Sequence, residues 1–250
     1  MSYIENPKTK GSGVLCAIPQ TGACPVKCAD CFFQSGRSFL EPLDENLPNL
    51  PTPEQAKGHI VRMNDGNDSN NQRDLVMEAA SKYERVFYNT SMPKDLAGFG
   101  GPVVLTVNPG KMTDKKIHKV NPVPDNLMFV RFRANTWNGT LCEEAVEYYT
   151  ERGVPVVLTF MAYYTQEIPA GHEWAYTLRP RTTNTYHVIR PSVWDEIMGV
   201  YADAGNALVY ACGKDAETFA CQRCGNCVRE YFVTSCRIGE GRKDDAEKKS

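Results

Sequence analysis

The stretch that most constrains the fold lies near the N-terminus and reads GVLCAIPQTGACPVKCADC (residues 13–31). Its first part, residues 13–18, is a short apolar run typical of a strand that is buried on both faces. Cys24, Cys28 and Cys31 follow directly, with C-x3-C-x2-C spacing. Three thiols on a short loop after a buried strand predict an iron–sulfur or other metal site at the end of that strand.

Further apolar runs repeat this strand pattern along the chain. They occupy residues 85–89, 102–107, 127–133, 154–160 and 207–211. Helical patterns lie between several of them, including residues 74–83 and residues 192–204, the latter followed by Gly205. Strands that alternate with helices indicate βαβ units and a parallel sheet. The predicted fold class is therefore α/β, a partial (β/α)6 barrel with mostly parallel strands and a C-terminal Cys-rich extension.

Two of the predicted helices carry recognisable N-terminal signals. Thr52 is followed by Pro53 and Gln55, and Thr140 is followed by Glu143; both patterns predict a capping box at the first turn. The second of these helices is expected to end at Gly153 and to bury one apolar stripe. That stripe consists of Leu141, Cys142, Ala145, Val146 and Tyr149.

Length and composition indicate one main globular domain. The chain has 250 residues, of which 42% are hydrophobic and 23% charged, with a formal net charge of −2. A charge this small gives no overall attraction to nucleic acid or to an acidic membrane. No stretch approaches the roughly 18 apolar residues of a membrane span, and the polar N-terminus does not resemble a signal peptide. We expect a cytoplasmic protein with no membrane partner.

The domain boundaries follow from the cysteine and charge patterns. We expect a barrel at residues 1–211, a Cys-rich metal-binding extension at 212–238 and a flexible charged tail at 239–250. Residues 34–73 and 163–190 form unusually long predicted connections, and such loops are commonly functional. The second connection mixes tyrosines, a tryptophan and arginines, including Arg181. Such a segment is either an ordinary lid over the barrel or a loop that contacts a nucleobase or phosphate.

The ten cysteines favour metal binding over disulfides, because the chain is long and has no export signal. A second group of five lies after the last predicted strand, at Cys212, Cys221, Cys224, Cys227 and Cys236. This spacing is the ligand pattern of a ferredoxin-type [4Fe–4S] cluster, which we favour, and tetrahedral zinc is the alternative. We predict Cys221, Cys224, Cys227 and Cys236 as the ligands and leave out Cys212, because it ends the last strand.

The C-x3-C-x2-C loop after the first strand resembles the signature of the radical S-adenosylmethionine (SAM) superfamily, and the alternating strands and helices resemble its partial barrel. The resemblance implies that Cys24, Cys28 and Cys31 hold a [4Fe–4S] cluster whose open iron binds SAM. Reductive cleavage of SAM would then yield a 5′-deoxyadenosyl radical that abstracts hydrogen from a substrate. The chain departs from the family at Asp30, where an aromatic residue is common. The C-terminal cysteines resemble the auxiliary-cluster segments of many such proteins.

The resemblance also directs attention to residues at the carboxyl ends of strands as SAM contacts. After the second predicted strand, where the family carries a motif that contacts the SAM amino group, this chain offers polar side chains. Two cations on one face of a buried strand need an anionic partner, which would be the SAM carboxylate, a substrate anion or a structural carboxylate. The predicted contacts are Asn89, Ser91, Arg131, Arg133, Asn135 and Tyr210.

The expected partners follow from the size of the barrel and from the implied chemistry. A small barrel without a recognition domain suits a small-molecule, nucleoside or short-peptide substrate, and an electron donor such as flavodoxin or ferredoxin would be required. The alternative from another class is a noncatalytic metalloprotein, either a two-cluster electron carrier or a zinc-stapled binding module. A zinc knot that only staples the N-terminal loop is the corresponding structural reading of Cys24, Cys28 and Cys31.

Overall fold

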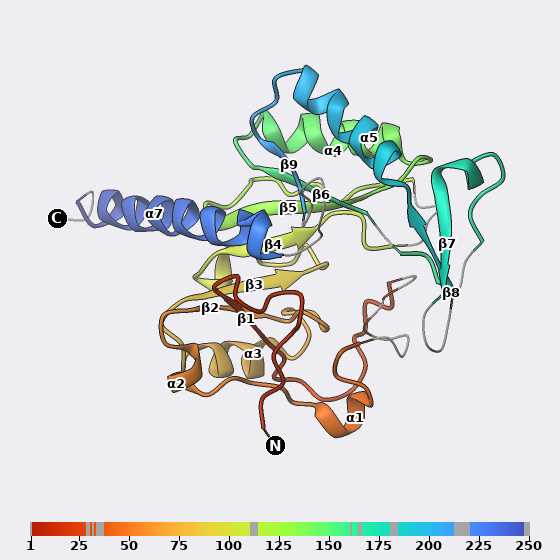
Figure 1. Cartoon of the computed structure of the whole chain (residues 1–250). Helices are drawn as coiled ribbons and strands as arrows, with labels where there is room; N and C mark the ends of the chain where they lie inside the picture. The colour runs from red at the N-terminus through yellow and green to blue at the C-terminus, as the bar shows by residue number, and fades with distance from the viewer. Residues whose placement is uncertain are drawn as a thin grey trace.

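A computed structural model describes residues 2–28, 31, 33, 38–110, 115–160, 162–164, 167–180, 185–212 and 221–247, with side chains as far as Gly239. Within these residues a seven-stranded sheet curls into a half-barrel, with the order β1-β2-β3-β4-β5-β6-β9 (Figure 1). All neighbouring strands in it are parallel. The strands are β1 (Val14–Ala17), β2 (Ile60–Met63), β3 (Val86–Thr90), β4 (Val103–Thr106), β5 (Leu127–Ala134), β6 (Val156–Phe160) and β9 (Val209–Ala211). The predicted fold class is confirmed.

The sequence patterns located every strand of this sheet except β2. That strand has only four residues and includes Arg62, so it reads as part of a polar loop rather than as an apolar run. A second missed feature is an antiparallel hairpin of β7 (Tyr176–Pro180) and β8 (Thr185–Ile189), which lies within the connection predicted at 163–190. Most of the side chains of β7 are exposed, so the hairpin lacks the continuous apolar signal of the central strands.

The described helices and 3-10 turns are short apart from four of them. They are α1 (Leu43–Asn46), α2 (Pro53–Ala56), α3 (Arg73–Ala80), η1 (Ala97–Phe99), α4 (Gly139–Thr150), η2 (Glu173–Ala175), α5 (Pro191–Asp203), α6 (Cys221–Cys224) and α7 (Asn226–Glu247). The capping box at Thr52 and Gln55 is confirmed. The one predicted at Thr140 is wrong, because Asn138 is the N-cap of α4 and Thr140 lies inside the helix. The apolar stripe of α4 is buried except for Leu141, which is half-buried.

Two layers of apolar side chains cover the two faces of the sheet. Helices α3, α4 and α5 pack on one face, where they form the larger core with buried residues such as Tyr149 and Trp194. Helix α7 covers part of the other face and contributes Tyr231 to a second, smaller core with Phe87 and Phe129 (Figure 1). Both faces of the central strands are therefore buried over much of their length, as parallel sheets require.

The C-terminal helix is longer than the sequence suggested. Residues 239–247, which we expected to form a flexible charged tail, continue α7 as helical backbone. The segment contains Arg, Lys, Glu and Ala, which have high helix propensity, and it extends a helix whose first half is docked on the sheet. No helix in the described part of the chain, α7 included, is long and apolar enough to span a membrane.

The face under α7 changes character along the strands. At the start of the strands it presents apolar residues such as Val104 and Phe129, and two positions later on the same strands it presents Thr106 and Arg131. Because side chains alternate between the two faces of a strand, residues two apart share one face. Thr106 pairs with Arg131 across β4 and β5, so these polar positions lie side by side. The carboxyl ends of the strands are thus lined with polar groups.

The docking of α7 gives a testable prediction for stability. Tyr231 is 8% exposed in the smaller core, whereas Val233, two residues later on the same helix, is 53% exposed. Tyr231→Ala should lower the free energy of unfolding by about 3 kcal/mol, because it leaves a cavity in a packed site. Val233→Ala should change it by less than about 0.5 kcal/mol. Chemical denaturation of both variants measures the difference, and equal effects would contradict the docking.

Candidate functional site

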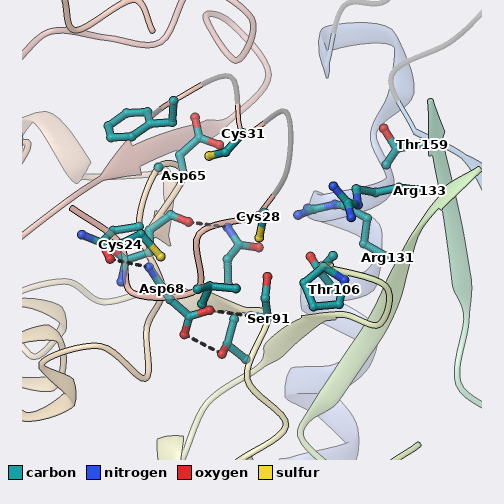
Figure 2. A pocket seen from close by; sticks show the side chains of 18 of the residues that line it. Cys24, Cys28, Cys31, Asp65, Asp68, Ser91, Thr106, Arg131, Arg133 and Thr159 are labelled. Carbon is teal, nitrogen blue, oxygen red and sulfur yellow. Dashed lines mark hydrogen bonds between the residues drawn. The ribbon is translucent and has the colours of Figure 1, made fainter. Parts of the chain in front are cut away.

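A cavity of about 400 Å³ opens at the carboxyl ends of the strands, on the face that α7 partly covers (Figure 2). This volume lies within the range of about 300–1,000 Å³ that cofactor and ligand sites occupy. Cysteines from both groups line the cavity, although they come from opposite ends of the chain. They are Cys24, Cys28, Cys31, Cys212 and Cys221.

The N-terminal cysteine loop is held in place by the segment that follows β2. The side-chain amide of Gln20 is buried and donates to the carbonyl oxygens of Asp68, at 3.0 Å, and Asn71, at 2.8 Å. Within the loop, the Cys31 amide donates to the Cys28 carbonyl at 3.3 Å. Asp30, the position that departs from the family pattern, lies outside the described residues. The loop is therefore fixed to a second polar segment of the same cavity.

The three thiols of this loop have the chemistry of a metal site but are not closed around one. Burial raises the pKa of Cys24 to about 11, and burial also raises the pKa of Cys28, while Arg133 opposes the shift at Cys28. The thiols of Cys24 and Cys28 are therefore protonated at neutral pH and would release protons when a cation binds. Among the described residues no three His, Cys, Asp or Glu side chains are arranged to hold a metal ion. The donor set fits an iron–sulfur cluster in kind, and binding would bring the thiols together.

The segment after β2 carries functional groups that the sequence interpretation did not identify. Asn64, Asp65, Gly66, Asn67 and Asp68 all line the cavity. Because β2 is the second strand of the sheet, this segment, and not Asn89 to Ser91, follows the second strand. The turn residues on both sides of the short run Ile60–Met63 are the signal that would have revealed the strand.

The carboxylate of Asp68, in this segment, is held by three hydrogen bonds. It accepts them from the Thr90 hydroxyl at 2.7 Å, the Ser91 amide at 2.6 Å and the Asn70 amide at 2.9 Å. Burial raises the pKa of Asp68 above its ordinary value, although these three bonds oppose the shift. A carboxylate has about four acceptor sites, so Asp68 can accept one more bond from a ligand in the cavity.

Gly66 is required for the packing of this segment against the cysteine loop. A Cβ atom at position 66 would lie 2.2 Å from the aromatic ring of Phe33. Phe33 is buried and follows Cys31 by two residues. The absence of a side chain at Gly66 therefore lets the ring close the wall of the cavity.

A buried arginine lies between the two cysteine groups. Arg62 of β2 forms an ion pair with Asp65 and donates to the Cys16 sulfur at 3.2 Å. Burial by itself lowers the pKa of Arg62, but Asp65 and Cys16 outweigh burial and raise that pKa well above its usual value. Arg62 lines the cavity, and its Nε has no hydrogen-bond partner among the described residues. It is a fixed positive charge at the base of the site.

The two predicted arginines of β5 both line the cavity, and they have different surroundings. The Arg133 guanidinium donates to the carbonyl oxygens of Asn108, at 2.8 and 2.5 Å, and of Gly110, at 2.7 Å. The Arg131 guanidinium lies 6.0 Å from the Phe129 ring and has no hydrogen-bond or ionic partner in the described part of the chain. Figure 2 shows both arginines across the cavity from Cys28. Arg133 braces β4 against β5, and Arg131 is the better placed to bind an anion.

The remaining predicted SAM contacts divide into two groups. Asn89 and Ser91 line the cavity. Asn135 and Tyr210 are not among its lining residues. Asn135 is buried and donates to the Tyr163 hydroxyl at 3.0 Å, while the Arg229 guanidinium lies 4.3 Å from the centre of the Tyr210 ring. Both residues pack the structure around the site instead of facing the cavity.

The long connection at 163–190 contributes little to the cavity. Tyr163 and Tyr176 are buried and contact Trp137, so they belong to the core beneath the hairpin. Tyr164 alone of the described residues in this connection lines the cavity, and Arg181 lies outside the described residues. Tyr163 and Tyr176 thus serve in packing.

The structure separates the predicted ligands of the C-terminal group. Cys221 lines the cavity together with Cys212, the cysteine that the sequence interpretation left out. Cys224 and Cys227 lie close to these two, near enough for charges on the thiols to influence one another. Cys236 is exposed on α7, nine positions beyond Cys227. Nine helical residues span about 13 Å, so Cys236 cannot reach the other three.

The raised pKa of Cys24 predicts how this thiol reacts. Because only the thiolate is alkylated, the iodoacetamide reaction of Cys24 in metal-free protein should accelerate about tenfold per pH unit from about pH 7 to 10, in keeping with a pKa of about 11. An ordinary thiol would level off above about pH 9. Mass spectrometry of the Cys24 peptide at each pH measures the rate, with a free model thiol as the reference. A plateau for Cys24 near pH 9 would disprove the shift.

Comparison of the chain with models of known families, with curated proteins and with solved structures finds no significant match. What the protein does is therefore inferred from its own residues and from their geometry. The half-barrel sheet is compatible with the partial barrel that the sequence predicted.

Proposed function

We propose that the protein is a radical SAM enzyme that uses a 5′-deoxyadenosyl radical to abstract hydrogen from its substrate. One observation carries this proposal: the three thiols of the C-x3-C-x2-C loop line a cofactor-sized cavity at the carboxyl ends of a parallel half-barrel. Ligands of parallel α/β sheets bind at this end of the strands. In the proposal, Cys24, Cys28 and Cys31 hold a [4Fe–4S] cluster that, when bound, supplies the electron that cleaves a carbon–sulfur bond of SAM.

The charges around the cavity support the binding of the amino acid portion of SAM, which carries an amino group and a carboxylate. Asp68 offers an acceptor for an ammonium group, and Arg131 offers a donor for a carboxylate. In the family, the position after the second strand contacts the SAM amino group, and in this chain that position is the segment that contains Asp68. We therefore move the proposed amino-group contact from Asn89 and Ser91 to Asp68.

The protein's own residues would position the reactants and exclude water. The Arg133–Asn108 brace fixes the ends of β4 and β5, where Thr106 and Thr159 line the cavity. A volume of about 400 Å³ suits a small molecule or a nucleoside better than a folded macromolecule. The proposal includes an electron donor such as flavodoxin or ferredoxin, since each cleavage consumes one electron.

The loop cysteines give the direct test of this function. Cys28→Ala should abolish 5′-deoxyadenosine formation from SAM with dithionite, because the cluster loses one of three protein ligands. Cys236→Ala, which removes an exposed thiol distant from the cavity, should leave formation unchanged. Chromatography of 5′-deoxyadenosine after anaerobic reconstitution measures both variants. Undiminished formation by an iron-replete Cys28→Ala variant would refute the proposal, and no formation by the iron-replete native chain would favour a noncatalytic metalloprotein.

The two arginines of β5 give a second test with a built-in comparison. Arg131→Ala should weaken SAM binding by about 2 kcal/mol, roughly thirtyfold, because a charge-assisted contact to the carboxylate is lost. Arg133→Ala should chiefly lower the melting temperature, because it removes the brace to Asn108 and Gly110. Equilibrium binding to the reconstituted protein and thermal unfolding separate the two effects. Native affinity in Arg131→Ala would remove this residue from the site.

A further inference from the structure

The end of β9 and the start of α7 are joined by a hydrogen bond from a buried side chain. The side-chain amide of Asn226 donates to the Ala211 carbonyl at 3.0 Å, and Asn226 is 6% exposed. Cys212 follows Ala211, and Cys227 follows Asn226. Both cysteines pack against the smaller apolar core. The bond therefore holds two thiols of the C-terminal group near each other in a fixed part of the structure.

The short helix α6 brings two more thiols to the same place. Cys221 and Cys224 are one helical turn apart, and Gly225, with a φ of 67°, turns the chain between α6 and α7. The Cys221 amide donates to the Lys8 carbonyl at 3.3 Å, which anchors α6 to the N-terminal segment. Cys221 then faces the cavity beside Cys212.

We call Cys212, Cys221, Cys224 and Cys227 the C-terminal cysteine cluster. Positive charge adjoins it, because Arg62 and Arg131 lie near enough to favour the thiolates of Cys212 and Cys227. When a metal ion binds, these thiols would release their protons to solvent, and the nearby guanidinium groups favour the thiolates that result.

Cys236 lies at the opposite end of the sheet from this cluster. The neighbouring Arg237 donates to the carbonyl oxygens of Asp125 and Leu127, each at 2.8 Å, just before and at the start of β5. The cavity lies at the other end of β5, where Arg131 and Arg133 line it. Strand geometry as well as helix length therefore excludes Cys236 from the cluster.

We propose that the C-terminal cysteine cluster binds one metal centre through four thiolates and that this centre borders the cavity into which the N-terminal thiols also face. The metal centre has four thiolate ligands, and the complex as a whole is a dianion. It is either a tetrahedral zinc ion or a [4Fe–4S] cubane. Among the described residues the four thiols are not arranged around an ion, so binding would draw their sulfur atoms together. The centre requires neither SAM nor the function proposed above.

Metal analysis of matched cysteine variants tests the assignment. After anaerobic purification and iron reconstitution, Cys212→Ala should lose about four irons per chain if the centre is a cubane, or about one zinc if it is tetrahedral. Cys236→Ala should keep the native metal content. Loss of that metal from Cys236→Ala with retention in Cys212→Ala would overturn the proposal, as would a native chain that holds metal only at the N-terminal cysteines.

Two further variants separate a missing ligand from a damaged fold and from a failure of the proposed function. Cys221→Ser changes a half-buried thiol on a short surface helix and should lose the same metal as Cys212→Ala. Cys28→Ala should lose only the metal of the N-terminal loop, so its remaining content reports the C-terminal centre whether or not SAM is cleaved. Native circular dichroism of Cys221→Ser, combined with native metal content, would also overturn the assignment.

Discussion

The parallel register of the half-barrel is the constraint on which the other features depend. Adjacent strands run in one direction, so their carboxyl ends meet at one edge, and side chains two residues apart share a face. Apolar residues occupy the start of the face under α7, and Thr106, Arg131 and Thr159 occupy its end. The core beneath α7 and the cavity beyond it are therefore two halves of one surface. Their boundary is set by where polar residues begin on each strand.

Buried charge gives the cavity its chemical character. Charged groups are costly to bury unless they are paired or hydrogen-bonded, and they concentrate where a ligand uses them. Arg62 is paired with Asp65, Asp68 accepts three hydrogen bonds, and Arg133 donates to carbonyl oxygens. The Arg131 guanidinium lies 6.0 Å from the Phe129 ring and has no hydrogen-bond partner among the described residues. The cavity thus combines charged groups that are held by the protein with a cation, Arg131, that a bound anion could neutralise.

The two cysteine groups reach the cavity by different routes. The first group lies on a loop after β1, which Gln20 fixes to the segment after β2. The second group is brought in by the end of β9 and by the contact of α6 with the N-terminal segment. Since both groups line one cavity, a metal at either group would influence the charge and reactivity of a ligand bound between them.

The sequence by itself determined the local features of this protein. Each of the long apolar runs became a strand of the parallel sheet, and the cysteine loop was correctly placed after the first of them. These strands could be predicted because a strand that is buried on both faces requires a continuous run of apolar residues. Strand β2 was missed because Arg62 interrupts its four residues, and with it the segment containing Asp68 was overlooked.

Only the tertiary structure decided which side chains meet. Spacing along the chain could not distinguish Cys212 from Cys236, since both flank the central cysteines by eight intervening residues. Helix α7 carries Cys236 away along its axis. The pairing of β9 with β6 and the Asn226–Ala211 hydrogen bond place Cys212 near Cys227. Arg131 and Arg133 likewise could not be distinguished from the sequence, because both lie on the same face of one strand. Their different surroundings appear only in the structure. A local pattern records the period of one element, whereas distances between elements depend on register and docking.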